Sequence, residues 1–164
     1  MALFYREMAS PVGKLKLIAN VNALVVVRLE GEQPDRLRLD APSADQHHPV
    51  LAETERQLAD YFAGSRTTFE LPIAPQGTEF QKKVWRHLTR IPFGKTKTYG
   101  DLARTVGSPG GSRAVGAACG KNPLAIVVPC HRVVGANGAL TGFGGGLETK
   151  AELLALEARV SGSK

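Results

Sequence analysis

The sequence predicts a mixed α/β (α+β) fold, in which a small antiparallel β-sheet with one helix precedes a mostly helical segment. Short β-branched, alternating stretches separated by turn residues occupy the start of the chain. Helical periodicity with capping residues dominates after residue 76. Residues 1–75 carry 8 Lys and Arg against 10 Asp and Glu, whereas residues 76–164 carry 13 against 5. We therefore expect two domains, residues 1–75 and 76–164.

Three strands are predicted in the first domain, at Leu3–Ala9, Lys14–Ala19 and Leu24–Leu29. Turn-forming residues separate them. Leucines alternate with lysines in the second strand, which is typical of an antiparallel strand with one buried face. Pro49–Ala63 is predicted as a helix that stops at Gly64, and Phe69–Ile73 as a short extended segment.

The stretch Glu32–His48 is polar and contains proline, so it is predicted as a loop. Within it, Leu37–Leu39 could form one weak strand or helical turn. His47 and His48 have no partner nearby in the sequence, and we assign both imidazoles to solvent. Nothing in the first domain indicates chemistry.

The second domain begins with a helix that Thr78 caps and that extends to about Thr89, with Glu79 in its first turn. A set of apolar residues recurs at helical spacing, which favours a core role over a binding stripe. These residues are Phe80, Val84, Trp85, Leu88 and Ile91.

Two short helices follow. Thr98 and Asp101 resemble a capping box for the first helix, which ends at Gly107. Ser108 is predicted to cap the second helix, with Pro109 at its first position and an end near residue 119. The spacing fits a DNA-binding helix-turn-helix, and it fits a helical hairpin of the core equally well.

The composition of the second helix bears on its function. Arg113 is its one long polar side chain, among Gly, Ala and Val. Readers of base sequence usually project Arg, Asn or Gln, so this helix would bind DNA with little sequence preference. The net charge of +8 over residues 76–164 favours a nucleic-acid partner, although a solvated basic surface is an equal alternative.

The centre of the chain's chemistry is a cysteine followed directly by a histidine. Leu124–Val128 is predicted as a short buried strand or strand-like segment that Pro129 ends. Cys130 would then be a nucleophile with His131 as a candidate base. The alternative, more common for a lone Cys–His pair, is a packed and inert thiol.

Two further features surround this pair in the sequence. A hairpin-like turn at Gly135–Ala139 precedes a glycine-rich loop, Leu140–Leu147, which can approach a ligand closely. The last helix is predicted over Glu148–Val160, and Glu157 lies on its apolar face. That carboxylate lies either at the rim of the core or buried against a partner, for which a histidine is the natural choice.

Several classes of protein are excluded. No apolar run approaches the ~18 residues that span a membrane, and the amino terminus is too charged for a signal peptide, so we expect a cytoplasmic protein. Two cysteines and four scattered histidines give no zinc-ligand spacing, and we expect no metal and no cofactor.

As a set, these residues resemble the O6-alkylguanine-DNA alkyltransferases, the methylated-DNA–protein-cysteine methyltransferases. The resemblance rests on Pro129–Val133 (PCHRV), the glycine loop, Glu157, and three upstream residues, Tyr99, Arg113 and Asn122. It implies an RNase H-like first domain and a winged-helix-like second domain with a helix-turn-helix. The implied partner is double-stranded DNA containing O6-alkylguanine, with O4-alkylthymine as a further substrate left open. The protein would act as a monomer, and cooperative binding along DNA is left open.

The resemblance also implies a role for each residue. Cys130 would accept the alkyl group, His131 would take its proton through a water, and Glu157 would orient His131. Tyr99 would donate to the departing guanine oxygen, and Asn122 would hold the active-site turns together. Arg113 would fill the gap left by the flipped nucleotide. DNA contacts would also come from Thr98, Tyr99, Ala114, Ala117 and Lys121. The substrate pocket would be formed by Pro129, Arg132, Val133, Phe143, Gly144 and Gly145.

The implied reaction is a direct, irreversible and stoichiometric transfer, because the thioether product has no labile bond. Phe143 stands where many relatives have tyrosine, and Gly144 replaces a hydroxyl residue of some relatives, which affects the selectivity of the pocket. Cys130 excludes the alkyltransferase-like proteins, which carry tryptophan there. Two alternatives stay open at this point: a non-catalytic DNA- or lesion-binding protein, and a Cys–His hydrolase.

Overall fold

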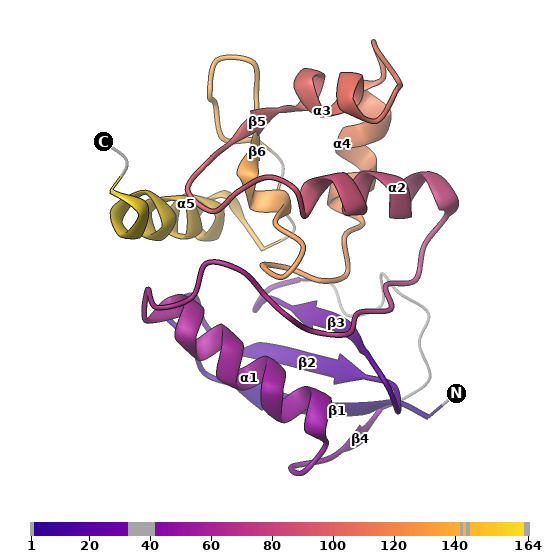
Figure 1. The fold of residues 1–164 in the computed structure, drawn as a ribbon, viewed down its shortest axis with the longest axis vertical. Helices are drawn as coiled ribbons and strands as arrows, with labels where there is room; N and C mark the ends of the chain where they lie inside the picture. Colours follow the sequence, from indigo (N-terminus) through magenta and orange to yellow (C-terminus); the bar gives the residue numbers. More distant parts are fainter. Residues whose placement is uncertain (1, 33–41, 142, 144, 163–164) are drawn as a thin grey trace.

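The computed structural model describes residues 2–32, 42–141, 143 and 145–162. In Figure 1 a β-sheet with one helix forms the lower half, and the remaining helices form the upper half. This arrangement confirms the predicted order, a sheet with a helix followed by a helical part. The predicted weak element at Leu37–Leu39 lies outside the described residues.

The described strands of the lower half form a sheet in the order β3-β2-β1-β4. Strands β1 (Phe4–Met8), β2 (Leu15–Ala19) and β3 (Leu24–Arg28) pair antiparallel, which confirms the predicted meander. Strand β4 (Ser43–Ala44) pairs parallel with β1 and was not predicted, because two small residues carry no pattern.

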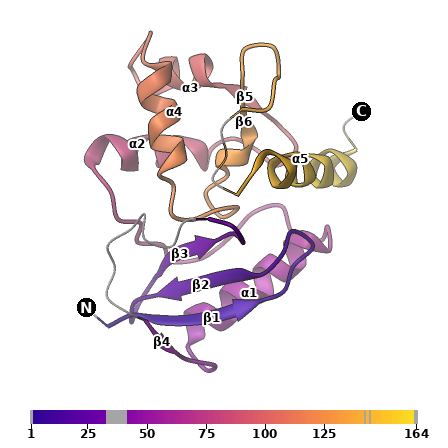
Figure 2. The same ribbon diagram turned by 180° about the vertical axis from the view of Figure 1, so that it is seen from behind.

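Helix α1 (Pro49–Phe62) covers one face of this sheet, as Figures 1 and 2 show from opposite sides. Leu15 and Leu17 of β2 share a buried cluster with Leu58 of the helix. The assignment of His48 to solvent is wrong. Its imidazole is buried, accepts a hydrogen bond from the Val50 amide and so caps α1, and its Nε2 lies 2.9 Å from a backbone oxygen of the β2–β3 turn.

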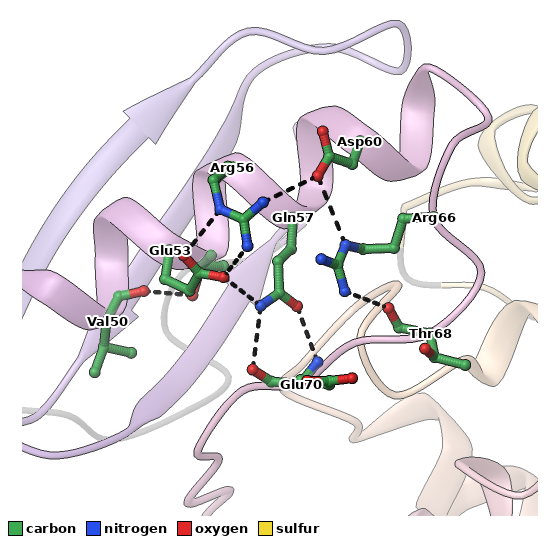
Figure 3. A network of polar contacts seen from close by, with 9 residues as sticks. Val50, Glu53, Arg56, Gln57, Asp60, Arg66, Thr68 and Glu70 are labelled. Carbon is green, nitrogen blue, oxygen red and sulfur yellow. Dashed lines mark hydrogen bonds and ion pairs between the residues drawn. The ribbon is translucent and has the colours of Figure 1, made fainter.

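A polar network on α1 fixes the segment that leads to the upper half (Figure 3). The Gln57 amide donates to the carbonyl of Glu70 and accepts from its N–H, as a neighbouring strand would. Arg66 donates to the Thr68 carbonyl and faces Asp60 of α1. The connector is therefore held against α1.

Helix α2 (Glu79–Leu88) begins with the predicted cap, because Thr78 and Gln81 form a reciprocal capping box. The indole of Trp85 donates to the Ala118 carbonyl at 2.8 Å and thereby fixes α4 (Ser112–Gly120) against α2. The predicted core role of Phe80 is wrong, since its side chain is 36% exposed at the start of the helix.

Helices α3 (Tyr99–Thr105) and α4 form the predicted helix pair, and Thr98 and Asp101 make the predicted capping box. The predicted start of α4 at Ser108 is wrong, because α4 begins at Ser112 after Gly111. Gly107 and Gly110 both adopt positive φ, and the Gly111 amide donates to the Ser108 carbonyl. The positive φ angles of these glycines add one further bend to the turn between α3 and α4.

The segment Leu124–Val128 is a series of tight turns, so the predicted strand is wrong. Ile126 has φ 71°, which breaks any extended run, and the Val128 amide donates to the Leu124 carbonyl. A 3₁₀ turn, Cys130–Arg132, follows directly. Two short strands that were not predicted, β5 (Lys97–Thr98) and β6 (Val133–Val134), then pair in parallel.

Helix α5 (Leu147–Ser161) ends the fold and lies above the carboxyl end of α1 in both views (Figures 1 and 2). One continuous cluster of buried apolar residues includes members of the sheet, α1, α2, α4 and α5. In the described part of the chain, no helix is both long and apolar enough to cross a lipid bilayer.

Candidate active site

The loop before Cys130 is held by one side chain and by the edge of the sheet. The Asn122 amide donates to the Val128 carbonyl at 2.8 Å, and its oxygen accepts from the Leu124 amide at 3.0 Å. Val27 of the edge strand β3 donates to the Pro123 carbonyl and accepts from the Ala125 amide. The loop thus pairs with the edge of the sheet at one position, and the side chain of Asn122 links the two ends of the loop.

Cys130 is half-buried at the start of the 3₁₀ turn and faces a small recess with room for about one water molecule. Burial raises the pKa of the thiol to about 11, while a hydrogen bond from Asn122 acts in the opposite direction. A thiol with this pKa is protonated at neutral pH, so it needs a base to become a nucleophile. The recess is lined by Leu29, Glu32, Cys119, Gly120, Asn122, Ala125, Cys130, Phe143 and Gly145.

The base candidate, His131, is fully buried beside Glu157 of α5. The His131 Nε2 lies 2.7 Å from the Glu157 Oε2. Because the carboxylate is ionised, the ring nitrogen that faces it must carry the proton. In the neutral ring the lone pair is then on Nδ1, which is buried and has no hydrogen-bond partner among the described residues. Burial lowers the pKa of His131, although Glu157 raises it, which favours this neutral form.

Glu157 accepts five hydrogen bonds from described residues. Oε2 accepts from His131, from the Tyr61 hydroxyl at 2.7 Å and from Arg132 at 3.0 Å. Oε1 accepts from Arg132 at 2.8 Å and from the Gly94 amide at 3.2 Å. Burial alone would raise the pKa of Glu157, but the bonds from His131 and Arg132 outweigh it and hold the pKa at about 2. The carboxylate is therefore buried against partners, not at the rim of the core.

Three of the predicted pocket residues lie away from the recess. Arg132 follows His131 on the 3₁₀ turn and pairs with Glu157, and it also donates to the Ile91 carbonyl. Its guanidinium lies over the Phe93 ring. Pro129 lines a separate cavity behind the turn together with Arg132, and Val133 is buried in the core. Phe143 and Gly145 line the recess beside Cys130, and Gly144 lies outside the described residues.

Tyr99 reaches the site through the β5–β6 pairing, which places the start of α3 beside the strand that follows the 3₁₀ turn. Its hydroxyl donates to the Thr141 carbonyl at 3.4 Å, and burial raises its pKa. A phenol with a raised pKa keeps its proton and remains a donor.

Lys150 is a site residue that the sequence did not reveal. Its side chain is completely buried, and Nζ donates to the Val133 carbonyl at 2.5 Å and to the Thr141 carbonyl at 2.8 Å. Nζ also lies 5.8 Å from the centre of the Tyr99 ring. Lys150 thus holds the glycine loop and Tyr99 against the acceptor turn. The feature of the sequence that could have indicated this role is a lysine within the apolar face of the last helix.

The predicted DNA contacts lie on an open face. Arg113, Ala114, Ala117 and Lys121 are all exposed on α4 or at its end. The hydroxyl of Thr98 is occupied, since it accepts the Asp101 amide as the cap of α3. The exposed face of α4 therefore offers small side chains with a cation near each end.

Sequence reasoning missed two further members of the site. Tyr61 lies on α1, 96 residues before its partner Glu157, and nothing in the predicted helix Pro49–Ala63 indicated that contact. Glu32 lines the recess from the end of the sheet, and polar composition had placed it in a loop. No cluster of His, Cys, Asp and Glu suited to a metal ion occurs within the ranges that the structure describes.

Comparisons with known proteins agree with this geometry. Residues 3–75 match the family described as "6-O-methylguanine DNA methyltransferase, ribonuclease-like domain". Residues 79–159 match the family described as "6-O-methylguanine DNA methyltransferase, DNA binding domain".

Relatives of similar length match almost the whole chain. The methylated-DNA–protein-cysteine methyltransferase of Methanosarcina acetivorans is 44% identical over 157 residues, covering 94% of this chain and 98% of that protein. The protein of the same name from Mycolicibacterium paratuberculosis is 46% identical, covering 96% and 93%. The crystal structure of Mycobacterium tuberculosis OGT in complex with DNA has a TM-score of 0.88 and 42% identity, covering 96% of this chain and 94% of that one.

Proposed function

Because the chain belongs to the 6-O-methylguanine DNA methyltransferase family, we propose that it repairs DNA by moving the alkyl group of O6-alkylguanine to Cys130. The observation that carries the assignment to Cys130 is the buried His131–Glu157 pair, whose histidine follows Cys130 on the 3₁₀ turn. That pair leaves Nδ1 of His131 as an unused base in the part of the structure described.

The reaction is a displacement at carbon. The Cys130 thiol gives its proton to His131 Nδ1 through a bridging water, and its sulfur forms a bond to the alkyl carbon. The bond between that carbon and guanine O6 breaks, Tyr99 passes its proton to the departing oxygen, and the proton held by His131 then returns through solvent to the Tyr99 phenolate. The histidine becomes an imidazolium that the ionised Glu157 stabilises at 2.7 Å.

The product limits each molecule to one reaction. A thioether on Cys130 has no bond that water can readily break, so the protein is consumed stoichiometrically. A repeated hydrolysis, as in a Cys–His hydrolase, would need an acyl intermediate, and an alkyl donor forms a thioether instead.

The DNA substrate binds at the exposed face of α4. Its small exposed residues allow the helix to approach the DNA backbone closely, with little reading of sequence. The target nucleotide has to leave the stack, which costs a few kcal/mol, and Arg113 fills the vacated position.

The proposal also covers the domain boundary, the oligomeric state and the compartment. The boundary between the two domains lies between residues 75 and 76, and the match of separate families to residues 3–75 and 79–159 supports this division. The protein acts as a monomer in the cytoplasm, and its two free cysteines fit a reducing compartment.

The proposal is tested by mixing the protein with a duplex that contains one O6-methylguanine and measuring its intact mass and a peptide map. We expect the mass gain of one methyl replacing hydrogen, on Cys130, saturating at one per chain. Cys130→Ala should abolish the gain while duplex binding survives. Binding without any mass gain in the unmodified protein would instead identify a non-catalytic lesion binder.

A further inference from the structure

We propose that Tyr61 is a positioning residue for alkyl transfer, through which α1 controls how strongly Glu157 holds His131. The inference rests on the proposed function of His131 as the base for Cys130. Tyr61 lies in the amino-terminal half of the chain, and the acceptor turn lies in the carboxyl-terminal half.

The geometry places the Tyr61 hydroxyl and the imidazole on the same atom. Tyr61 donates to Glu157 Oε2 at 2.7 Å, and His131 Nε2 lies 2.7 Å from that same oxygen. Arg132 also donates to this oxygen, at 3.0 Å, and the three donors compete for its charge. The hydroxyl therefore weakens the hold of Glu157 on the His131 proton and also fixes the carboxylate in one orientation.

The tyrosine itself is firmly held. It is completely buried, and its ring contacts Phe62 of the same helix, Phe69 of the connector and Phe93 beside Arg132. Burial, with Glu157 nearby, raises the pKa of its hydroxyl, so it stays a donor at every pH at which the protein is folded. The position of α1 is thereby transmitted to the relay by a rigid ring.

The electrostatic surroundings decide the sign of the effect. His131 faces Glu157 and Lys150 from α5, Arg132 from its own turn, and Tyr61 from α1 only through Glu157. Removing the hydroxyl leaves more negative charge on Oε2, which stabilises the protonated imidazole. The pKa of His131 should rise, and the neutral base should be available only at higher pH.

The test compares the intact protein with Tyr61→Phe, which keeps the ring, and with Thr54→Val as a matched control. Thr54 is a buried residue of the same helix whose hydroxyl donates to the Val50 carbonyl, remote from Glu157. The first readout is nitrogen NMR of the His131 ring across pH. We expect the His131 pKa to rise by about half a unit or more in Tyr61→Phe and to stay unchanged in Thr54→Val.

Where the protein unfolds before His131 titrates, the proton shift of the Nε2–H group reports the same bond. It should move downfield in Tyr61→Phe, because the His131–Glu157 bond becomes stronger. A second variant, with 3,5-difluorotyrosine at position 61, keeps the hydroxyl and makes it a stronger donor. It should move both quantities in the opposite direction, and it covers the case in which Tyr61→Phe does not fold.

The second readout is the rate of methyl transfer from the duplex. Tyr61→Phe should shift the rising limb of the pH–rate profile to higher pH by the change in the His131 pKa. Equal rate losses in Tyr61→Phe and Thr54→Val, with His131 unchanged, would reduce Tyr61 to a core residue and overturn the inference. Failure of the unmodified protein to accept a methyl group would defeat the proposed function, and the NMR result would still decide the role of Tyr61.

Discussion

Replacing the buried carboxylate by an amide, Glu157→Gln, should destabilise the protein and slow alkyl transfer together. The change leaves the guanidinium of Arg132, a residue that is 5% exposed, without its counter-charge. It also turns an amide N–H₂ toward Arg132, which faces both oxygens of Glu157 and can only donate. Breaking a buried ion pair from one side typically costs about 3–5 kcal/mol.

The pKa of Glu157 gives an independent value for the contribution of this carboxylate to stability. It falls from 4.5 to about 2 in the folded protein, which corresponds to about 3 kcal/mol of stability. A carboxyl group with a depressed pKa contributes this stability above its unfolded pKa and loses it as the pH falls toward the folded pKa. The contribution is therefore complete above about pH 5 and disappears between about pH 4.5 and 2.

Urea unfolding at pH 7 measures the stability lost in Glu157→Gln, and urea unfolding at lower pH measures how the contribution of Glu157 to stability depends on pH. We expect Glu157→Gln to lose about 3 kcal/mol at pH 7, a fall in Tm of about 6–12 °C for a chain of this size. The variant should also lack the part of the acid destabilisation that Glu157 causes. The double variant Arg132→Met/Glu157→Gln should recover stability without recovering alkyl transfer. A loss below about 1 kcal/mol, or a double variant less stable than Glu157→Gln, would refute the account of Glu157 as the counter-charge of Arg132.

Two further predictions concern the acceptor loop and the DNA face. Asn122→Ala removes two buried hydrogen bonds and should lower the free energy of unfolding by about 1–3 kcal/mol and slow transfer, as chemical denaturation and single-turnover kinetics would measure. Asn137→Ala, in an exposed turn, is its control, and equal effects of the two changes would contradict the bridging role. Arg113→Ala should impair repair of a duplex more than reaction with free O6-benzylguanine, because only the duplex requires the nucleotide to be flipped. Arg90→Ala removes an exposed charge outside α4 and should leave the ratio of the two rates unchanged, and equal losses on both substrates in Arg113→Ala would remove Arg113 from the flipping step.

Local sequence determined the regular elements. The Thr78 and Thr98 caps and the stop at Gly64 each depend on residues within a few positions, and the structure agrees with them. The alternation predicted for β2 holds only in part, because Ile18 is also buried, in a second cluster on the other face of the sheet. The same local logic failed at Leu124–Val128, where β-branched residues suggested a strand. There the positive φ of Ile126 and the two bonds of Asn122 impose turns that propensity does not encode.

The candidate site divides in the same way. Cys130, His131 and Glu157 could be proposed from the sequence, because a nucleophile beside a base and a carboxylate on an apolar helix face are unusual there. Whether Glu157 is at the rim or buried depended on tertiary structure. So did the placement of Arg132 behind the turn and of Lys150 beneath the glycine loop.

The sequence by itself thus determined the chemical groups and most of the elements that carry them. Tertiary structure decided which groups meet. Tyr61 and Glu157 are 96 residues apart, and Lys97 meets Val133 only through the pairing of two-residue strands. No local preference specifies such contacts, because they form when distant apolar faces are buried together and the enclosed polar groups must find partners.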